Sequence, residues 1–143
     1  MPKPSPIPDE LSKPFFDACT EDRLIVQECA ACTELAGLMV LQHPPSEACV
    51  RCGQSDSLRW TPVSGGGTIQ TYAVMYDTPI ASLQPDQPFN LAVIQLNEDK
   101  NAVFLSHLPG TPVGDVTMGA PVQVEFEVTP ATGQKVPEWR VVG

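Results

Sequence analysis

The chain of 143 residues lacks any long hydrophobic run, because its longest mostly apolar stretch, Leu35 to Leu41, has only seven residues. A helix that spans a bilayer needs about 20 apolar residues. The N-terminal residues Met1 to Pro4 also lack the apolar segment of a secretion signal. The sequence therefore predicts a protein that is not bound to membranes and that works in the cytoplasm.

Basic residues are scarce as well. Eight Lys and Arg stand against seventeen Asp and Glu, which gives a formal net charge of −9, and aromatic residues make up 6% of the chain. A protein that binds single-stranded nucleic acid needs a basic groove along the backbone and aromatic faces on which bases stack. The composition therefore argues against nucleic acid and other phosphate-rich partners.

Cysteine, by contrast, is present in an informative pattern. Cys29 and Cys32 form one pair, Cys49 and Cys52 form a second, and sixteen residues lie between the two pairs. This spacing is typical of four thiolates placed tetrahedrally around one metal ion. The sequence thus predicts a rubredoxin-like zinc ribbon with a structural Zn²⁺. Four thiolates leave zinc no open coordination position, so the metal should stabilise the fold and catalyse nothing.

Three alternatives to this site follow from the same residues. The pairs could form two disulfides in a secreted domain, but the sequence shows no secretion signal. His43 lies between the pairs and could replace a sulfur, although four cysteines already complete the tetrahedron. Iron fits the same sulfur geometry as in rubredoxin, so zinc is preferred on frequency and not on spacing.

The pattern of residues divides the chain into three parts. Residues 1–23 form a Pro-rich arm and a short helix, with Ser12 as the N-cap, Pro14 in the first turn and an end before Arg23. Residues 24–60 form the zinc ribbon, with one strand at 24–28 and a second supplied by 35–41. Residues 61–143 form the third part.

Residues 61–143 show strand patterns and turns without helical periodicity. Expected strands cover 68–76, 91–96, 102–108, 122–128 and 139–142, and the second and third form a hairpin. In the first strand Ile69, Ala73 and Met75 should share one face. Gly65 to Gly67 and Gly119 provide the bends of a small barrel. The sequence predicts a mainly β protein with a five-stranded OB-type barrel, with a β-sandwich as the alternative.

No residue set in the sequence predicts catalysis. Gly65 to Gly67 lack the following Lys and helix of a phosphate-binding loop. Cys19 and His107 lack a third orienting residue, so a core thiol and a strand-end imidazole are the simpler interpretation. We therefore predict no catalytic residues and expect no activity from this chain alone.

Several segments, taken in order, carry a resemblance to a known family. They are Pro8 to Glu10, Phe15 to Ala18, Arg23 to Cys29, His43 to Pro45, Cys49 to Gly53 and Gly67 to Tyr72. The chain is similar over essentially its whole length to the zinc-ribbon plus OB-fold acyl-CoA-associated proteins. It departs from them at Thr33, where the family more often has glycine, and at Glu28, where a basic residue is common.

The resemblance implies a non-catalytic accessory subunit in a hetero-oligomer. Family members assemble with thiolase-superfamily enzymes, as in phloroglucinol C-acyltransferase, archaeal acetoacetyl-CoA thiolase with hydroxymethylglutaryl-CoA synthase, and steroid side-chain retro-aldolases. The family's barrel has also been suggested to hold an acyl-CoA, which an acidic chain supports poorly. The rival hypothesis is a single-stranded nucleic-acid-binding module of ribbon and barrel.

Apolar anchors on exposed segments are the natural contacts for such a partner. The short helix offers two adjacent aromatic residues, and the thirteen-residue connection 77–89 is near the length at which loops tend to be functional. The predicted partner-contact residues are Phe15, Phe16, Pro79, Pro85 and Phe89.

Overall fold

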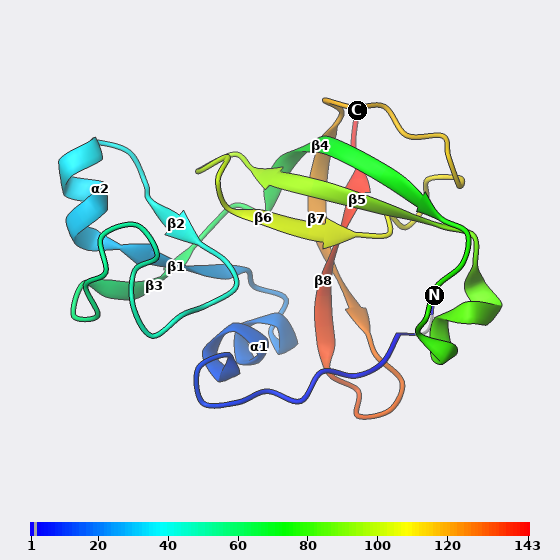
Figure 1. Cartoon of the computed structure of the whole chain (residues 1–143), viewed down its shortest axis with the longest axis horizontal. Coiled ribbons are helices and arrows are strands. Elements are labelled where there is room, and N and C mark those ends of the chain that lie inside the picture. Colours follow the sequence, from blue (N-terminus) through cyan, green and yellow to red (C-terminus); the bar gives the residue numbers. More distant parts are fainter. Residues whose placement is uncertain (2) are drawn as a thin grey trace.

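A computed structural model of the chain describes residue 1 and residues 3–143. Pro2 of the predicted arm lies outside the described residues. The helices are α1 (Lys13–Thr20), α2 (Ala30–Ala36) and the 3₁₀ helix η1 (Ala81–Asp86). The strands are β1 (Ile25–Cys29), β2 (Leu41–Gln42), β3 (Leu58–Pro62), β4 (Gly66–Met75), β5 (Phe89–Leu96), β6 (Val103–Ser106), β7 (Pro121–Val128) and β8 (Lys135–Val141). The mainly β class is confirmed (Figure 1).

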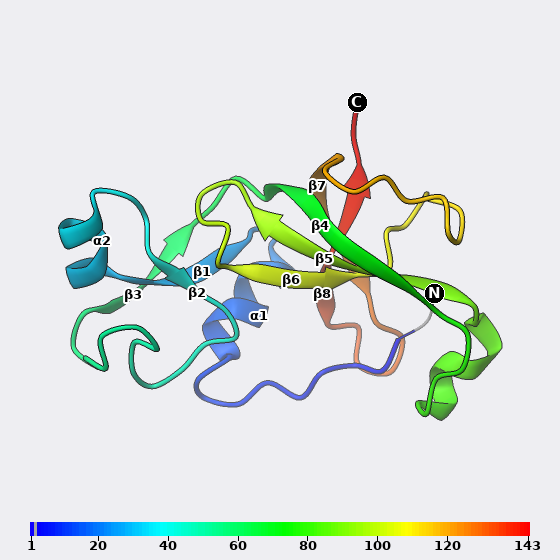
Figure 2. The same ribbon diagram turned by 45° about the horizontal axis from the view of Figure 1, so that its top comes forward.

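The predicted N-terminal helix is present as α1. Pro14 lies in its first turn, where a missing N–H costs no hydrogen bond. Ser12 precedes the helix without capping it, and its hydroxyl oxygen accepts from the Asp9 N–H (3.0 Å) instead of from an N–H of the helix. Phe15, Ala18 and Cys19 form the buried face of α1. The helix thus packs against the barrel and the ribbon, below both in Figure 2.

The ribbon is a three-stranded antiparallel sheet in the order β2-β1-β3. The strand predicted at 35–41 is present only at its last residue, Leu41, where β2 begins and pairs with β1. Residues 30–36 form α2 instead, and the long partner of β1 is β3, from Ile25↔Pro62 to Cys29↔Leu58. Ala30, Ala31 and Glu34 are good helix formers, and Gly37 ends α2 with φ of 70°. The helical turn brings Cys32 back toward Cys29, which an extended chain cannot do.

The second sheet is antiparallel, five-stranded and ordered β6-β5-β4-β7-β8, and the predicted hairpin is its β5–β6 pair. Residues 61–64, at the end of β3 and beyond, lead into it (Figure 2). The predicted faces of β4 were wrong, because the register shifts between Ile69 and Thr71. This bulge puts Tyr72 on the core side with Ile69 and leaves Ala73 exposed.

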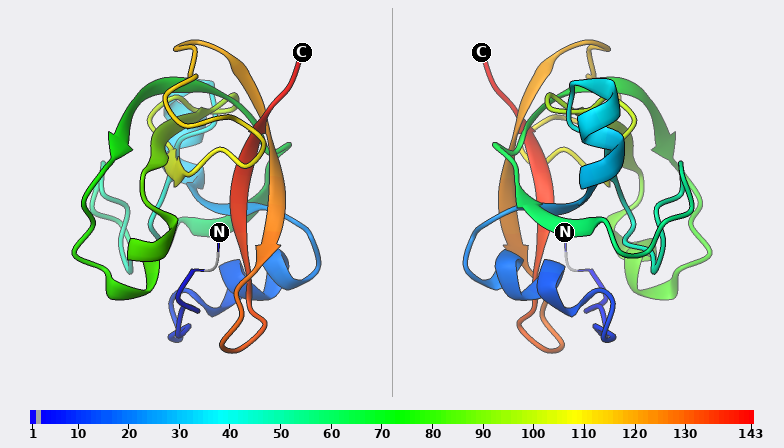
Figure 3. Two further views of the ribbon diagram at one scale, coloured as in Figure 1. Left: turned by 90° about the vertical axis from the view of Figure 1, so that its right-hand side faces the viewer. Right: turned by 90° about the vertical axis from the view of Figure 1, so that its left-hand side faces the viewer.

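The sheet curls into a nearly closed OB-type barrel, with β4 and β5 opposite β7 and β8 in Figure 3 (left). Side chains complete the seam between β6 and β8. Ser106 Oγ donates to Glu138 Oε2 (2.7 Å) and accepts from the Trp139 backbone N–H (2.9 Å). Across the barrel, Trp139 Nε1 donates to the Gly65 carbonyl (2.9 Å). Gly65 has φ of +82°, and a Cβ there would collide with Val124.

One hydrophobic core serves both sheets. Leu24, Val26 and Leu41 of the ribbon pack with Ile94 and Trp139 of the barrel. The far end of the ribbon has only a small cluster of its own, made of Val40 and three of the cysteines. Folding of that end therefore depends on what holds the sulfurs together. No helix in the described part of the chain is long and apolar enough to cross a membrane.

Candidate metal centre and surface grooves

The four paired cysteines come together in space. Their Sγ atoms all lie within 4.8 Å of one another, with Cys29 and Cys52 3.8 Å apart and Cys32 and Cys49 3.9 Å apart. Tetrahedral zinc with Zn–S bonds of about 2.3 Å requires sulfurs about 3.8 Å apart. The spacing therefore fits a tetrahedral metal ion, and the predicted ligand set is assembled.

Local structure aims each sulfur at this point. Cys29 ends β1, Cys32 lies in the first turn of α2, and the other two flank a tight turn closed by the bond from Gly53 N–H to the Cys49 carbonyl (2.9 Å). Gly53 adopts φ of 80°, as this turn requires. Burial opposes ionisation of Cys49, but backbone N–H donors from Cys52 and Arg51, each 3.4 Å away, lower the pKa of its thiol to about 6. Cys49 thus favours the thiolate, whereas burial and the neighbouring cysteines raise the pKa of the Cys32 thiol to about 12.

A buried carboxylate supports the metal turn, and sequence reasoning missed it. Glu28 is 2% exposed and accepts from Thr61 Oγ1 (2.6 Å), Thr33 Oγ1 (2.7 Å) and Arg59 Nε (3.1 Å). Burial alone would raise the pKa of Glu28, but the three donors together hold it below its usual value. Thr33 Oγ1 also accepts from the Val40 N–H (3.0 Å). The two departures from the family pattern, Glu28 and Thr33, are thus hydrogen-bond partners.

An apolar groove of about 760 Å³ lies between the N-terminal arm, α1, the 43–45 loop, β6 and β8. Its floor is a set of aromatic rings: the His43 centroid lies 4.0 Å from that of Phe104 and 5.1 Å from that of Phe15. Burial lowers the pKa of His43 to about 4, so its imidazole is neutral at pH 7. His43 is therefore an aromatic packing residue and not a ligand of the cysteine site.

The predicted contact residues fall into two places. Phe15 is 3% exposed and belongs to the chain's own core, whereas Phe16 is half-buried at the groove. In the 77–89 connection Pro79 and Pro85 are exposed and Phe89 is half-buried. This connection contains η1, whose Leu83 is buried, so it is an ordered cover at one end of the barrel.

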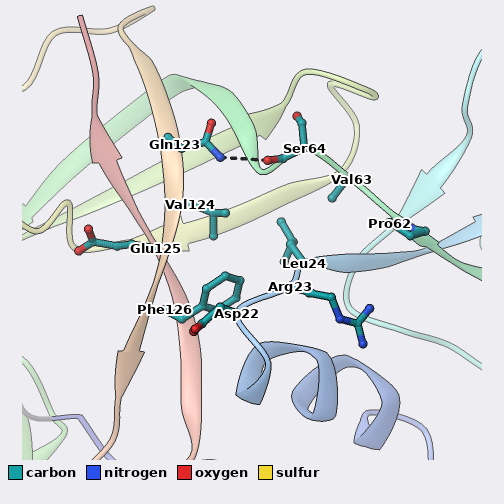
Figure 4. A pocket seen from close by; sticks show the side chains of 10 residues that line it. All are labelled: Asp22, Arg23, Leu24, Pro62, Val63, Ser64, Gln123, Val124, Glu125 and Phe126. Carbon is teal, nitrogen blue, oxygen red and sulfur yellow. Dashed lines mark hydrogen bonds between the residues drawn. The ribbon is translucent and has the colours of Figure 1, made fainter.

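A second cleft, of about 600 Å³, separates the start of the ribbon from β7 (Figure 4). Val124 and Leu24 form its apolar part, and Gln123 Nε2 donates to the Ser64 carbonyl (2.9 Å) across its top. Its charged residues are Asp22, Arg23 and Glu125. Glu125 already pairs with Arg140 (2.9 Å), so the cleft presents no free acid and base pair.

Neither residue weighed as a catalyst is placed for catalysis. Cys19 is fully buried in α1, and burial raises the pKa of its thiol to about 12. His107 Nε2 lies 2.8 Å from Glu127 Oε2, in a network where Lys3 contacts Glu138. This network joins the N-terminal arm to the barrel seam.

The profile described as "ChsH2, C-terminal OB-fold domain" matches residues 60–127. A protein of Thermomonospora curvata named "Probable enoyl-CoA hydratase alpha subunit" is 31% identical over 114 residues, which are 78% of this chain and 32% of that protein. Over its barrel the chain is thus similar to the OB-fold domain of ChsH2. It spans about a third of the length of the Thermomonospora curvata protein.

Solved structures share the fold of this chain. A chain of the "Ltp2-ChsH2(DUF35) aldolase" superposes with a TM-score of 0.75 at 24% identity, covering 96% of this chain and 98% of that one. A DUF35 protein of unknown function from Sulfolobus solfataricus gives a TM-score of 0.60 at 15% identity, covering 93% and 86%. The arm, ribbon and barrel thus recur together.

Proposed function

We propose that this protein is a member of the DUF35 family and a non-catalytic accessory subunit of a thiolase-superfamily enzyme that makes or breaks carbon–carbon bonds at acyl groups. The observation that carries the proposal is the likeness, over 96% of the chain, to the DUF35 component of an aldolase named for two proteins, Ltp2 and ChsH2. The relative named as an alpha subunit of an enoyl-CoA hydratase also points to a multi-subunit enzyme of acyl-CoA chemistry.

The chemistry of the described residues supports a structural role. The cysteine cluster offers four thiolates, which would hold Zn²⁺ with no position left for substrate. Zinc would supply a rigid crosslink when bound, and the backbone N–H groups of Arg51 and Cys52 donate to the Cys49 sulfur that would bind it. All five cysteines are free thiols, which suits the reducing cytoplasm.

The proposed contacts with the catalytic subunit are Phe16 at the groove and Pro79, Pro85 and Phe89 at the end of the barrel. Phe15 would support this contact indirectly, because its buried ring packs against that of Phe16 and anchors α1 in the core. Nucleic-acid binding gains no support, since six of the eight Lys and Arg residues form ion pairs within the described chain.

Co-expression tests the proposal. The chain is produced with each thiolase-superfamily protein encoded in the source genome, and the mixtures are separated by size-exclusion chromatography. We expect one of them to co-elute with the chain and to lose acyl-CoA turnover when expressed without it. The proposal is wrong if the purified chain alone turns over acyl-CoA, or if every candidate elutes separately and works unchanged.

A further inference from the structure

The metal-binding end of the ribbon exposes large apolar side chains. We call α2 with residues 37–38 and the turn 49–52 the ribbon tip. Leu35 is 89% exposed, Val50 76% and Leu38 75%. Together with Ile7 in the arm, they are the four most exposed large hydrophobic side chains of the described chain. Single exposed apolar residues are ordinary, but three at one end of a small protein make that end a candidate docking surface.

Two of these side chains belong to residues that lie close in the sequence to cysteines of the cluster. Leu35 follows Cys32 by one helical turn, and Val50 directly follows Cys49. The sulfurs of those two cysteines lie only 3.9 Å apart. Leu38 stands just after Gly37, which ends α2. Figure 3 (right) looks directly at this end of the molecule, where α2 stands foremost.

The fold itself makes little use of α2. The only buried residue of this helix is Cys32, so its apolar Leu35 contributes nothing to the core of the chain. The metal cluster would nevertheless hold the tip rigid, because three of the cysteines pack with Val40. A rigid surface loses little conformational entropy when it binds, which favours docking.

The charges around the tip indicate the partner surface. Glu34, Glu47 and Asp56 are exposed, and Arg51 is the only exposed cation among the tip residues. None of these four forms an ion pair among the described contacts. Three carboxylates and one guanidinium leave two negative charges, and a zinc tetrathiolate adds about two more. Such a surface attracts a cationic partner.

We propose that the ribbon tip docks on the catalytic subunit, on a face where Lys and Arg side chains surround an apolar recess that receives Leu35 and Val50. This inference rests on the proposed function and adds to it the contact surface and its charge. The zinc then has a role in assembly, because it sets the relative positions of the two anchors.

The test uses the full-length chain and the thiolase-superfamily protein that co-elutes with it. The double variant Leu35→Gln/Val50→Thr removes both anchors with polar residues of similar size. We expect its dissociation constant to rise at least tenfold, while zinc content and melting temperature stay unchanged. Matched controls are Ile7→Gln, which is 93% exposed in the arm, and Met118→Gln, which is 64% exposed in the connection between β6 and β7. Both controls should bind like the wild type.

A charge variant tests the second half of the inference. Glu34→Gln/Glu47→Gln should slow association at low salt by several fold and leave the rate nearly unchanged at high salt. Wild-type binding by the double anchor variant would show that the tip does not dock on the partner. If the wild-type chain binds no candidate, the proposed function itself fails, and the inference with it.

Discussion

Replacing Phe15 and Phe16 separately by alanine separates a core residue from a contact residue at adjacent positions. Phe15 is 3% exposed, and its ring centroid lies 5.1 Å from those of both Phe16 and His43 and 6.1 Å from that of Phe104. Phe16 lies on the rim of this set and is half-buried. The two substitutions remove the same atoms from very different surroundings.

The structure sets the expected magnitudes. Loss of a buried phenylalanine costs about 3–5 kcal/mol, because the cavity left behind does not fully collapse. Unfolding entropy of about 2.1 cal/mol/K per residue gives about 0.3 kcal/mol/K for the whole chain, so Phe15→Ala should lower the melting temperature by about 10–17 °C. Phe16→Ala should lower it by only a few degrees, since part of the Phe16 surface is already in water.

In the binding assay the order of the two variants should be reversed, with the larger loss of affinity for Phe16→Ala. Phe16→Ala should raise the dissociation constant of the complex about 30-fold, which corresponds to about 2 kcal/mol for an anchor residue. Thermal unfolding followed by circular dichroism gives stability, and titration calorimetry with the co-eluting subunit, at a temperature where both variants are folded, gives affinity. Both should keep their metal. Equal stability of the two variants would refute the assignment of Phe15 to the core, and wild-type affinity of Phe16→Ala would exclude it as an anchor.

Two further predictions concern the ribbon. Elemental analysis should find one zinc per chain, and Cys49→Ser should release it and expose the ribbon amides to hydrogen exchange while the barrel amides stay protected; metal-free wild-type protein, or the visible spectrum of an iron–thiolate site, would refute this. Glu28→Gln should lower the free energy of unfolding, measured in urea at pH 7, by about 1–2 kcal/mol, because it turns charge-assisted hydrogen bonds into neutral ones. The pKa of Glu28 is lowered in the folded chain, so its contribution is present above its ordinary pKa of about 4.5 and is lost as pH falls through the folded value. The gap between wild type and Glu28→Gln should therefore shrink below about pH 4.5; a gap that stays constant with pH would contradict the role given to the carboxylate charge.

Some features of the sequence predict structure because they depend on few neighbours. The spacing of the two cysteine pairs identified the ligand set, since a tight turn brings both sulfurs of a pair together wherever the turn lies. Alternation in residues 122–128 predicted β7, and the polar turn between 91–96 and 102–108 predicted a hairpin, because both signals are local.

Other features were decided by contacts between distant residues. The bulge after Ile69 reverses the faces of β4. No local sequence pattern predicts this bulge, because it arises from the pairing of β4 with β5. Glu28 reads as one more surface acid until Thr61 and Arg59, about thirty residues later, surround it. Phe15 and Phe16 are equivalent in the sequence, and only the rings of His43 and Phe104 make one of them core and leave the other at the surface. The sequence determined which sulfurs come together in a cluster that could hold a metal ion. Tertiary packing decided which neighbours are buried, because burial depends on what the rest of the chain brings alongside.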